Sequence, residues 1–389
     1  MPNALIVHGG APTAVMNASL FGAICEAKKY GEIAHFYAAI GGSAAIKAER
    51  FLDLKTIPER SLQLLPFTPA SAIGTSRDAL SEEDYDEIAQ VIGKRGIEYV
   101  FFNGGNGSMD TCGKVYQACR ARGVSVRVVG IPKTIDNDIA VTDHAPGYGS
   151  AARYLAATVS EVSQDVRALP IHVSVVEAMG RNTGWIAAAS ALARSGSGDG
   201  PDLIYFPERP FEEERFLADV ERVHREKGGV VVVASEGLRY ADGTPIVEPV
   251  FQVGRAVYYG DVGAHLANLV IRRLGIKARS EKPGIIGRAS IAFQSPLDRE
   301  EAEAVGRAAV RAALEGRTGV MVGLLRDGAG PYRVHEELIP IEQVMLEERT
   351  VPDAFISREG NDVTPAFMEW CRPLLGGELR QFVTFKNLL

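Results

Sequence analysis

The sequence predicts an α/β protein built from two doubly wound, mostly parallel sheets. Short apolar runs typical of buried strands alternate with amphipathic stretches of helical spacing, and this alternation occurs twice along the chain. Glycine-rich turns follow several of the runs, as they do where a strand leads into a helix. At 389 residues the chain is also longer than one hydrophobic core usually allows. We therefore expect two domains of the βαβ type.

The individual elements follow from this alternation in chain order. The apolar runs predict strands at 4–8, 33–40, 98–103, 124–130, 171–177, 202–206, 230–235 and 319–325. The amphipathic stretches predict helices at 14–30, 81–95, 108–122, 149–168, 182–194, 211–227, 260–274 and 298–315. We expect a first domain at 1–145, rejoined by part of the C-terminal region, a second at 146–325, and a segment at 326–389 that packs back on the body.

Composition narrows the function classes. A hydrophobic content of 46% and a charged content of 23% are those of an ordinary globular enzyme. The net charge of −7 gives no general attraction to nucleic acid or to an anionic membrane. The first residues are expected to form a strand and not a signal peptide, and no apolar run approaches a membrane span, so we predict a cytoplasmic protein. The four cysteines are interpreted as structural thiols: Cys25, Cys112, Cys119 and Cys371.

The most informative segment is 132–138, Pro-Lys-Thr-Ile-Asp-Asn-Asp, which follows a predicted strand. In a parallel sheet, ligands bind just beyond the carboxyl ends of the strands. One carboxylate there can accept a proton from an alcohol, a second can hold Mg²⁺, and the lysine ammonium can neutralise a phosphate. The segment therefore predicts phosphoryl transfer to a hydroxyl group.

Two glycine-rich loops join predicted strands to helices. The first is 8–13, His-Gly-Gly-Ala-Pro-Thr, and the second is 103–108, Asn-Gly-Gly-Asn-Gly-Ser. Glycines let the backbone approach an anion, and a helix N-terminus presents N–H groups to it. The alternative is a pair of turns without a ligand. We expect Ser108 to be an N-cap and His8 to be a structural residue.

Three further segments carry polar residues that can bind a ligand. Arg77 in the loop 74–78 can stabilise a phosphoryl group in transfer or form a surface salt bridge. Arg181 in 177–185 can reach a phosphate, although this stretch can also be a plain glycine turn. Glu236 can accept a hydrogen bond from a sugar hydroxyl or cap a helix.

Positive charge is concentrated in one short stretch of this acidic chain. Four basic residues fall within it: Lys277, Arg279, Lys282 and Arg288. This favours a phosphorylated ligand, whereas the alternative is a solvated basic loop.

In this order, these segments resemble the phosphofructokinase family. The segment 132–138 matches its most specific signature, and the similarity covers nearly the whole chain. The segments 12–19, 146–152 and 184–189 are more similar to the pyrophosphate-dependent branch. The resemblance implies an active site in the cleft between two domains, with 1–145 binding the donor and 146–325 binding a sugar phosphate.

The resemblance also implies roles for individual residues. Asp136 would be the general base, Arg77 would stabilise the moving phosphoryl, and Mg²⁺ would be held by Asp138 with Asn106. The donor-binding residues would be Gly10, Gly105, Asn106, Gly107, Ser108 and Lys133. Fructose 6-phosphate would contact Thr134, Asp138, Met179, Gly180, Arg181, Glu236, Arg279 and Arg288. Because Arg279 would come from a neighbouring subunit, a homodimer or homotetramer is implied.

The implied reaction is reversible transfer from pyrophosphate to the 1-hydroxyl of fructose 6-phosphate. Lys133 is typical of pyrophosphate-dependent members, since a long cation can hold a short diphosphate where a nucleotide needs room. Gly107 is instead the nucleotide-type residue, so ATP is the alternative donor.

Four positions depart from the family pattern and reduce charge or hydrogen bonding toward phosphate: Asn106, Ala11, His172 and Ile285. The neutral Asn106 is expected to weaken Mg²⁺ binding, and the methyl group of Ala11 could crowd a phosphate. These departures leave open an acceptor that is another sugar, sugar phosphate or polyol. They also leave open a regulatory subunit that has lost catalysis.

Overall fold

The computed structural model describes residues 1–389 except 197–198, 254–255, 329, 346 and 386–389. The chain divides into two compact units. Unit 1 consists of residues 1–150 and 288–349, and unit 2 of residues 151–287 and 350–389.

The second domain was expected to span 146–325, but the chain returns to unit 1 already at residue 288. Residues 288–325 belong to unit 1 because helix α11 (Pro296–Leu314) packs along α1 (Met16–Ala27) and strand β12 (Val320–Arg326) pairs with β5 (Arg127–Pro132). The expected segment 326–389 is likewise divided, with its first part in unit 1 and the rest in unit 2.

Unit 1 is a seven-stranded sheet with helices on both faces. Its other strands are β1 (Asn3–His8), β2 (Phe36–Ala39), β3 (Phe51–Asp53), β4 (Ile97–Gly104) and β13 (Val334–Pro340). Its other helices are α2 (Ala44–Lys47), α3 (Glu59–Leu62), α4 (Glu82–Lys94) and α5 (Asn106–Ala121), with 3₁₀ turns at Leu54–Thr56, Leu65–Phe67 and Ile341–Gln343. The strand order is β13-β12-β5-β4-β1-β2-β3, in which β3 and β13 are antiparallel to their neighbours and all other pairs are parallel.

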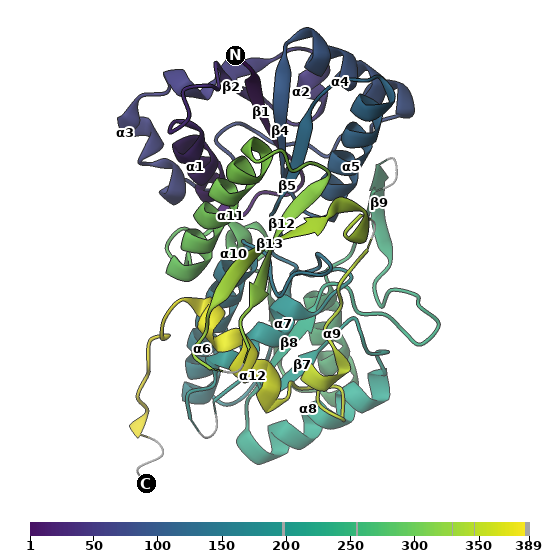
Figure 1. The fold of residues 1–389 in the computed structure, drawn as a ribbon. Helices are drawn as coiled ribbons and strands as arrows, with labels where there is room; N and C mark the ends of the chain where they lie inside the picture. Colours follow the sequence, from purple (N-terminus) through teal and green to yellow (C-terminus); the bar gives the residue numbers. More distant parts are fainter. Residues whose placement is uncertain (197–198, 254–255, 329, 346, 386–389) are drawn as a thin grey trace. The chain divides into compact units, whose positions relative to one another are not determined.

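The two faces of this sheet follow from the alternation of side chains along each strand. In β1, Leu5 and Val7 pack in the core under α4 and α5, whereas Ala4 and Ile6 pack under α1 and α11. Figure 1 shows these helix pairs on opposite sides of β1, β4 and β5. Helices α1 and α11 approach closely: a Cβ added at Gly22 would lie 2.1 Å from the carbonyl oxygen of Glu303.

Unit 2 contains a four-stranded parallel sheet in the order β11-β6-β8-β7 and a two-stranded antiparallel ribbon. Its strands are β6 (Val173–Ala178), β7 (Leu203–Tyr205), β8 (Val230–Ser235), β9 (Pro249–Val253), β10 (Ala256–Tyr259) and β11 (Ala278–Glu281). Its helices are α6 (Tyr148–Ala168), α7 (Trp185–Ala189), α8 (Glu213–Lys227), α9 (Val262–Leu274), α10 (Ile285–Ala289) and α12 (Pro365–Cys371), and α6 and α10 each overlap the division between the units. Three 3₁₀ turns lie at Ser190–Ala193, Asp353–Phe355 and Arg372–Leu375. Val173 and Val175 of β6 join a core with apolar residues of α8 and α9.

Every predicted strand and helix has a counterpart, so the α/β fold class with parallel sheets is confirmed. The predicted helix 182–194 is shorter, because α7 gives way to a 3₁₀ turn. The strands that the sequence analysis missed are β3, β9, β10, β11 and β13. Cys112 and Cys119 pack in the core of unit 1, which fits their interpretation as structural thiols.

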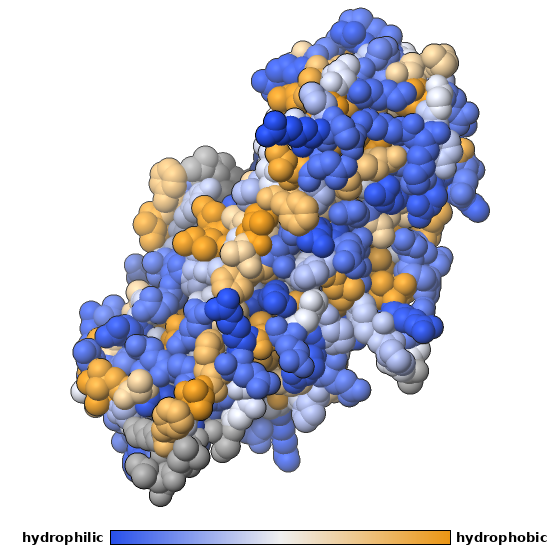
Figure 2. Space-filling view, turned by 90° about the vertical axis from the view of Figure 1, so that its left-hand side faces the viewer, coloured by the Kyte–Doolittle hydropathy of each residue, from blue (hydrophilic) through white to orange (hydrophobic). Residues whose placement is uncertain are grey.

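Polar and apolar residues are interspersed on the protein surface. On the face drawn in Figure 2, hydrophobic residues lie in small groups between hydrophilic ones. Among the helices of the described residues, none has the length and apolar character needed to cross a membrane.

Candidate active site

The segment 132–138 turns at the carboxyl end of β5. Asn137 adopts a left-handed backbone (φ 51°), which asparagine tolerates better than most residues, and its Oδ1 accepts from the Ala145 N–H at 3.2 Å. The Thr134 hydroxyl accepts from the Asp136 N–H at 3.0 Å and donates to Asp138 Oδ1 at 2.8 Å. These local bonds fix the backbone around both carboxylates.

A cleft of about 430 Å³ lies in unit 1 where β1, β4 and β5 end. Both aspartates and both glycine-rich loops contribute to it, as expected for the carboxyl edge of a parallel sheet. The lining residues predicted from the sequence are Gly10, Arg77, Gly105, Asn106, Gly107, Ser108, Lys133, Thr134, Asp136 and Asp138. The structure therefore brings together all the residues predicted to bind the donor or to act in catalysis.

The two glycine-rich loops pack around Ser108. A Cβ added at Gly9 or Gly104 would lie 2.2 or 2.1 Å from Ser108 Oγ, so neither position has room for a side chain. The prediction that Ser108 is an N-cap was wrong: α5 begins at Asn106, its N-cap is Gly105, and Ser108 lies within the first turn. Gly107, in contrast, faces open space, since a Cβ there would meet nothing within 4 Å.

Lys133 is a buried cation that connects the segment 132–138 to the first glycine-rich loop, 8–13. Its side chain is 3% exposed, and its Nζ donates to the Ala11 carbonyl at 2.6 Å. Burial lowers the pKa of Lys133 to about 8, against the opposing effect of the Asp136 and Asp138 carboxylates. The ammonium is therefore protonated at neutral pH, and it lies in the cleft next to Gly10 in the first glycine-rich loop.

The metal-binding expectation rests on Asn106 and Asp138. The Asn106 side-chain nitrogen donates to Asp138 Oδ2 at 3.0 Å, while its Oδ1 is buried and has no hydrogen-bond partner. Burial raises the pKa of Asp138, an effect that a bound cation would reverse. Within the described residues, no three His, Cys, Asp or Glu side chains are arranged as a complete metal site. These oxygens fit Mg²⁺, which usually takes one or two carboxylates and completes its shell with waters and substrate phosphates.

Arg77 is placed by pairing between two loops. The Gly10 N–H donates to the Ser76 carbonyl at 2.8 Å, and the Thr75 hydroxyl donates to the Gly10 carbonyl at 2.8 Å. Arg77 is exposed at the rim of the cleft, so its guanidinium can reach an anion without the cost of burying a charge.

Part of the predicted acceptor site forms a second group in unit 2, at the ends of β6 and β8. The Gly180 N–H donates to Glu236 Oε1 at 3.3 Å, and the Ser235 hydroxyl donates to the Gly180 carbonyl at 2.5 Å. Gly180 has φ 119°, a conformation that favours glycine. Met179 is half-buried beside it and Arg181 is exposed.

Arg279 lies apart from this group. In the register of β11 on β6, Arg279 is opposite Ser174, five residues before Met179, or roughly 16 Å along the strand. It lies close to His172, whose pKa is lowered by burial and then by the charge of Arg279. Arg288 lies in α10 and is not among the residues that line the cleft of unit 1.

Comparison with known proteins identifies the fold and family. The family model described as Phosphofructokinase matches residues 3–313. The chain belongs to the phosphofructokinase family. One curated relative, the pyrophosphate–fructose 6-phosphate 1-phosphotransferase of Rhodospirillum rubrum, is 39% identical over 383 residues, covering 96% of this chain and 94% of the relative.

Two further matches cover nearly the whole length. The crystal structure of a pyrophosphate-dependent phosphofructokinase from Nitrosospira multiformis is 34% identical with a TM-score of 0.90, covering 98% of this chain and 94% of that one. A sulfofructose kinase from Alkalicoccus urumqiensis is 31% identical over 373 residues, covering 95% of this chain and 94% of the relative. This member of the phosphofructokinase family is thus a phosphotransferase.

The cleft of this family member also contains residues that the sequence analysis missed. They are Ser43, Ser76, Asp78, Thr111 and Glu348. Glu348 is the most informative, because its charge acts on Asp138 and its backbone is bridged to that of Ile139. It lies far from both in the sequence, so only the folded chain shows that a third acid is near Asn106.

The surroundings of His8 fit its interpretation as a structural residue. It is fully buried, and its Nδ1 lies 2.8 Å from the Ser71 hydroxyl. Burial lowers the pKa of His8 to about 3, so the ring is neutral. It therefore supports the first glycine loop as a structural residue.

Proposed function

We propose that this protein transfers a phosphoryl group from pyrophosphate to the 1-hydroxyl of fructose 6-phosphate. The observation that carries the proposal is the buried ammonium of Lys133 in the same cleft as Asp136 and two phosphate-type glycine loops. A fixed cation suits a small, highly charged diphosphate. The names of the relatives from Rhodospirillum rubrum and Nitrosospira multiformis support the same donor.

In this proposal Asp136 accepts the proton of the 1-hydroxyl as its oxygen bonds to a phosphorus atom of the donor. The bond from that phosphorus to the bridging oxygen breaks, and orthophosphate leaves with the electron pair. Arg77 and Lys133 offset the charge that develops on the phosphoryl oxygens. Asp138 and Asn106 would hold Mg²⁺, which neutralises phosphate charge when bound. An anhydride is exchanged for a phosphate ester, so the reaction runs in both directions.

The acceptor is assigned to unit 2. Glu236 and the backbone at Gly180 form a polar group suited to sugar hydroxyls, and Arg181 supplies a cation for the 6-phosphate. Arg288, and Arg279 from a neighbouring subunit, would add to the phosphate contacts, so the active enzyme is a homo-oligomer in this proposal.

Two alternatives are each favoured by one observation. Gly107 leaves open space beside the donor loops, which favours ATP as donor. His172 and the exposed Ile285 replace phosphate-binding residues, and the similarity to a sulfofructose kinase favours a different acceptor.

One assay separates these candidates. Purified protein with Mg²⁺ is given pyrophosphate or ATP together with fructose 6-phosphate or sulfofructose, and the phosphorylated sugar is measured. Turnover with pyrophosphate and at least about 100-fold less with ATP is expected. Turnover with ATP alone would refute the donor assignment. Turnover with sulfofructose but not with fructose 6-phosphate would refute the acceptor, and silence with every pair would favour a regulatory subunit.

A further inference from the structure

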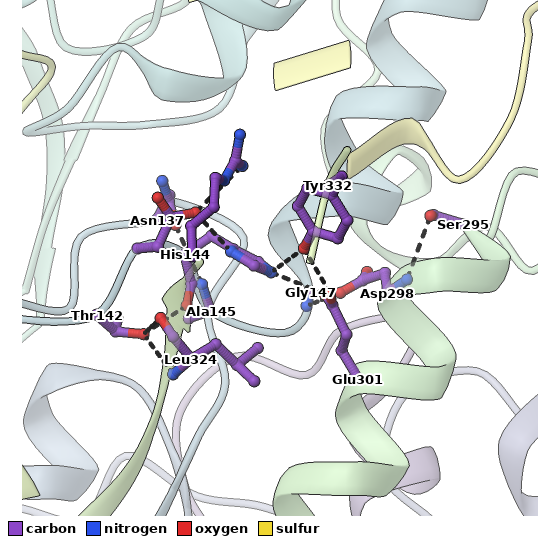
Figure 3. Close-up of polar contacts among 12 residues, drawn as sticks. Asn137, Thr142, His144, Ala145, Gly147, Ser295, Asp298, Glu301, Leu324 and Tyr332 are labelled. Atoms are coloured by element: carbon purple, nitrogen blue, oxygen red, sulfur yellow. Dashed lines mark hydrogen bonds and ion pairs between the residues drawn. The ribbon is translucent and has the colours of Figure 1, made fainter. Parts of the chain in front are cut away.

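A buried cluster of charges lies behind the catalytic segment, outside the cleft. His144 is 1% exposed and lies between two carboxylates: its Nδ1 is 2.9 Å from Asp143 Oδ2 and its Nε2 is 2.7 Å from Glu301 Oε2. The Tyr332 hydroxyl donates to Glu301 Oε1 at 2.5 Å, and Arg326 pairs with Asp143 Oδ2 at 3.2 Å. Figure 3 shows the His144 ring directed at Glu301 and Tyr332.

The geometry indicates the charge on His144. Carboxylate oxygens accept hydrogen bonds, so both ring nitrogens must donate, which only an imidazolium can do. Burial alone would lower the pKa of His144, but the hydrogen bonds to Asp143 and Glu301 outweigh it and raise the pKa to about 9. His144 thus pairs as a cation with both carboxylates, and Arg326 pairs with that of Asp143.

The cluster connects the catalytic segment to a rigid helix. Glu301 belongs to α11, which packs against α1, whereas His144 belongs to the loop that carries Asp136 and Asp138. Three bonds hold that loop in one shape. The Ala145 N–H donates to Asn137 Oδ1, the Thr134 N–H donates to the Pro146 carbonyl at 3.0 Å, and the Thr142 hydroxyl donates to the His144 carbonyl at 2.8 Å.

A second attachment lies next to the first. Asp298, one turn before Glu301 on α11, accepts from the Gly147 N–H at 2.8 Å and from the Ser150 hydroxyl at 2.5 Å. Gly147 has φ 112°, and a Cβ there would lie 2.6 Å from the Thr134 carbonyl oxygen, so the loop closes tightly at this point. Asp298 holds the end of the loop through the Gly147 N–H and the Ser150 hydroxyl, whereas His144 holds its middle through charge.

We propose that His144 is a positioning residue that attaches the segment 133–147 to α11 and so holds the Asp136 and Asp138 carboxylates in the cleft. His144 is not among the residues that line the cleft, so we assign it no contact with the substrates. Its importance for turnover rests on the proposed phosphoryl transfer, whereas its effect on the loop does not.

The direct test is amide hydrogen exchange of the full chain with His144→Gln. One glutamine amide cannot donate to two carboxylates on opposite sides, so the loop should open locally. We expect exchange in the peptide 133–147 to quicken about tenfold or more, while peptides from β1 and α4 change little. The matched control is His335→Gln, because His335 makes an exposed pair with Asp327 at 2.6 Å in the same unit and should alter nothing in 133–147.

The double variant His144→Gln with Glu301→Gln tests whether charge pairing is the cause. It removes one cation and one anion together, so it should restore part of the lost protection. Unchanged exchange in 133–147 for His144→Gln would overturn the proposal, and so would equal acceleration across all of unit 1. If His144→Gln does not fold, Glu301→Gln decides, because it removes the carboxylate through which α11 holds His144. Faster exchange confined to 133–147 supports the proposal, and no change overturns it.

Kinetics supply the functional half of the test. Displaced carboxylates should lower kcat about 10- to 100-fold in His144→Gln, whereas the KM for fructose 6-phosphate, whose binding is assigned to unit 2, stays within about twofold. A normal kcat together with a loosened loop would overturn the claim that the attachment positions the carboxylates. If wild-type protein is inactive with every donor and acceptor, the proposed function fails, yet the exchange experiment still decides the attachment.

Discussion

The donor cleft of unit 1 and the strand-end group of unit 2 differ in construction, although both lie at the carboxyl ends of parallel strands. In unit 1 the polar side chains are held by bonds within the cleft: Thr134 and Asn106 bond to the Asp138 carboxylate, and Lys133 bonds to the backbone carbonyl of Ala11. In unit 2 the described bonds run mainly between backbone groups and Glu236 or Ser235, and Arg181 is exposed.

This difference teaches where function is sensitive to substitution. A cleft whose side chains hold each other is preorganised, so a change there should alter the chemical step. A group that relies on exposed, flexible side chains gains its ligand contacts only on binding, so a change there should mainly alter affinity. The predictions below test this contrast, beginning with the largest expected effect.

Asp136→Asn should have the largest effect. The substitution keeps the shape of the side chain but removes the group that accepts the hydroxyl proton, so kcat should fall about 1,000-fold in steady-state assays. The melting temperature should change little. Asp86→Asn is a suitable control, since Asp86 forms an exposed pair with Arg122 outside the cleft. A kcat within about tenfold of wild type would show that Asp136 is not the base.

Lys133→Met should have the second-largest effect on activity. It removes the buried charge but keeps most of the side-chain length, so kcat/KM for pyrophosphate should fall about 100-fold. Stability should be unchanged or higher, because burying the ammonium costs free energy in the absence of an anion. Chemical denaturation and donor kinetics measure the two effects. If the variant lost free energy of unfolding together with activity, Lys133 would be a structural residue.

The sequence predicted the donor cleft more completely than it predicted its acidic environment. The heptad around Asp136 and the glycine loops are local signals, and parallel strands bring their ends together whatever the rest of the chain does. Glu348 and Glu301 reach this region from distant segments through tertiary packing. No spacing rule connects them to Asp138 or His144, so the sequence alone could not place them.

The fold was predictable for a similar reason. The buried parallel strands are continuous apolar runs, which single-sequence patterns detect well. Strand β11 was missed because Ala278–Glu281 is polar and lies at the edge of its sheet, where burial does not constrain composition. The early return of the chain to unit 1 was missed because the packing of α11 on α1 depends on glycines at their contact, such as Gly22 and Gly306.

Glu236→Gln tests the acceptor side of the contrast. Gln keeps one carbonyl oxygen but loses the charge that strengthens hydrogen bonds from sugar hydroxyls, so the KM for fructose 6-phosphate should rise about tenfold. The KM for pyrophosphate and the melting temperature should stay near wild type, with Glu226→Gln on the exposed face of α8 as control. A large fall in kcat without a change in acceptor KM would contradict the view that this group acts through affinity.

The smallest expected effect is the pH dependence of donor binding. The pKa of Lys133 is lowered to about 8 in the folded protein, so its ammonium is present below that pH and is lost as the pH rises through it. Between pH 7 and pH 8.5 the protonated fraction falls about fourfold, and the KM for pyrophosphate should rise by a similar factor. Bound pyrophosphate stabilises the charged form of Lys133 and so raises its pKa. The rise in KM should therefore be at most about fourfold. In Lys133→Met the KM is already high and should not change over this interval, whereas a parallel rise in both proteins would assign the titration to another group.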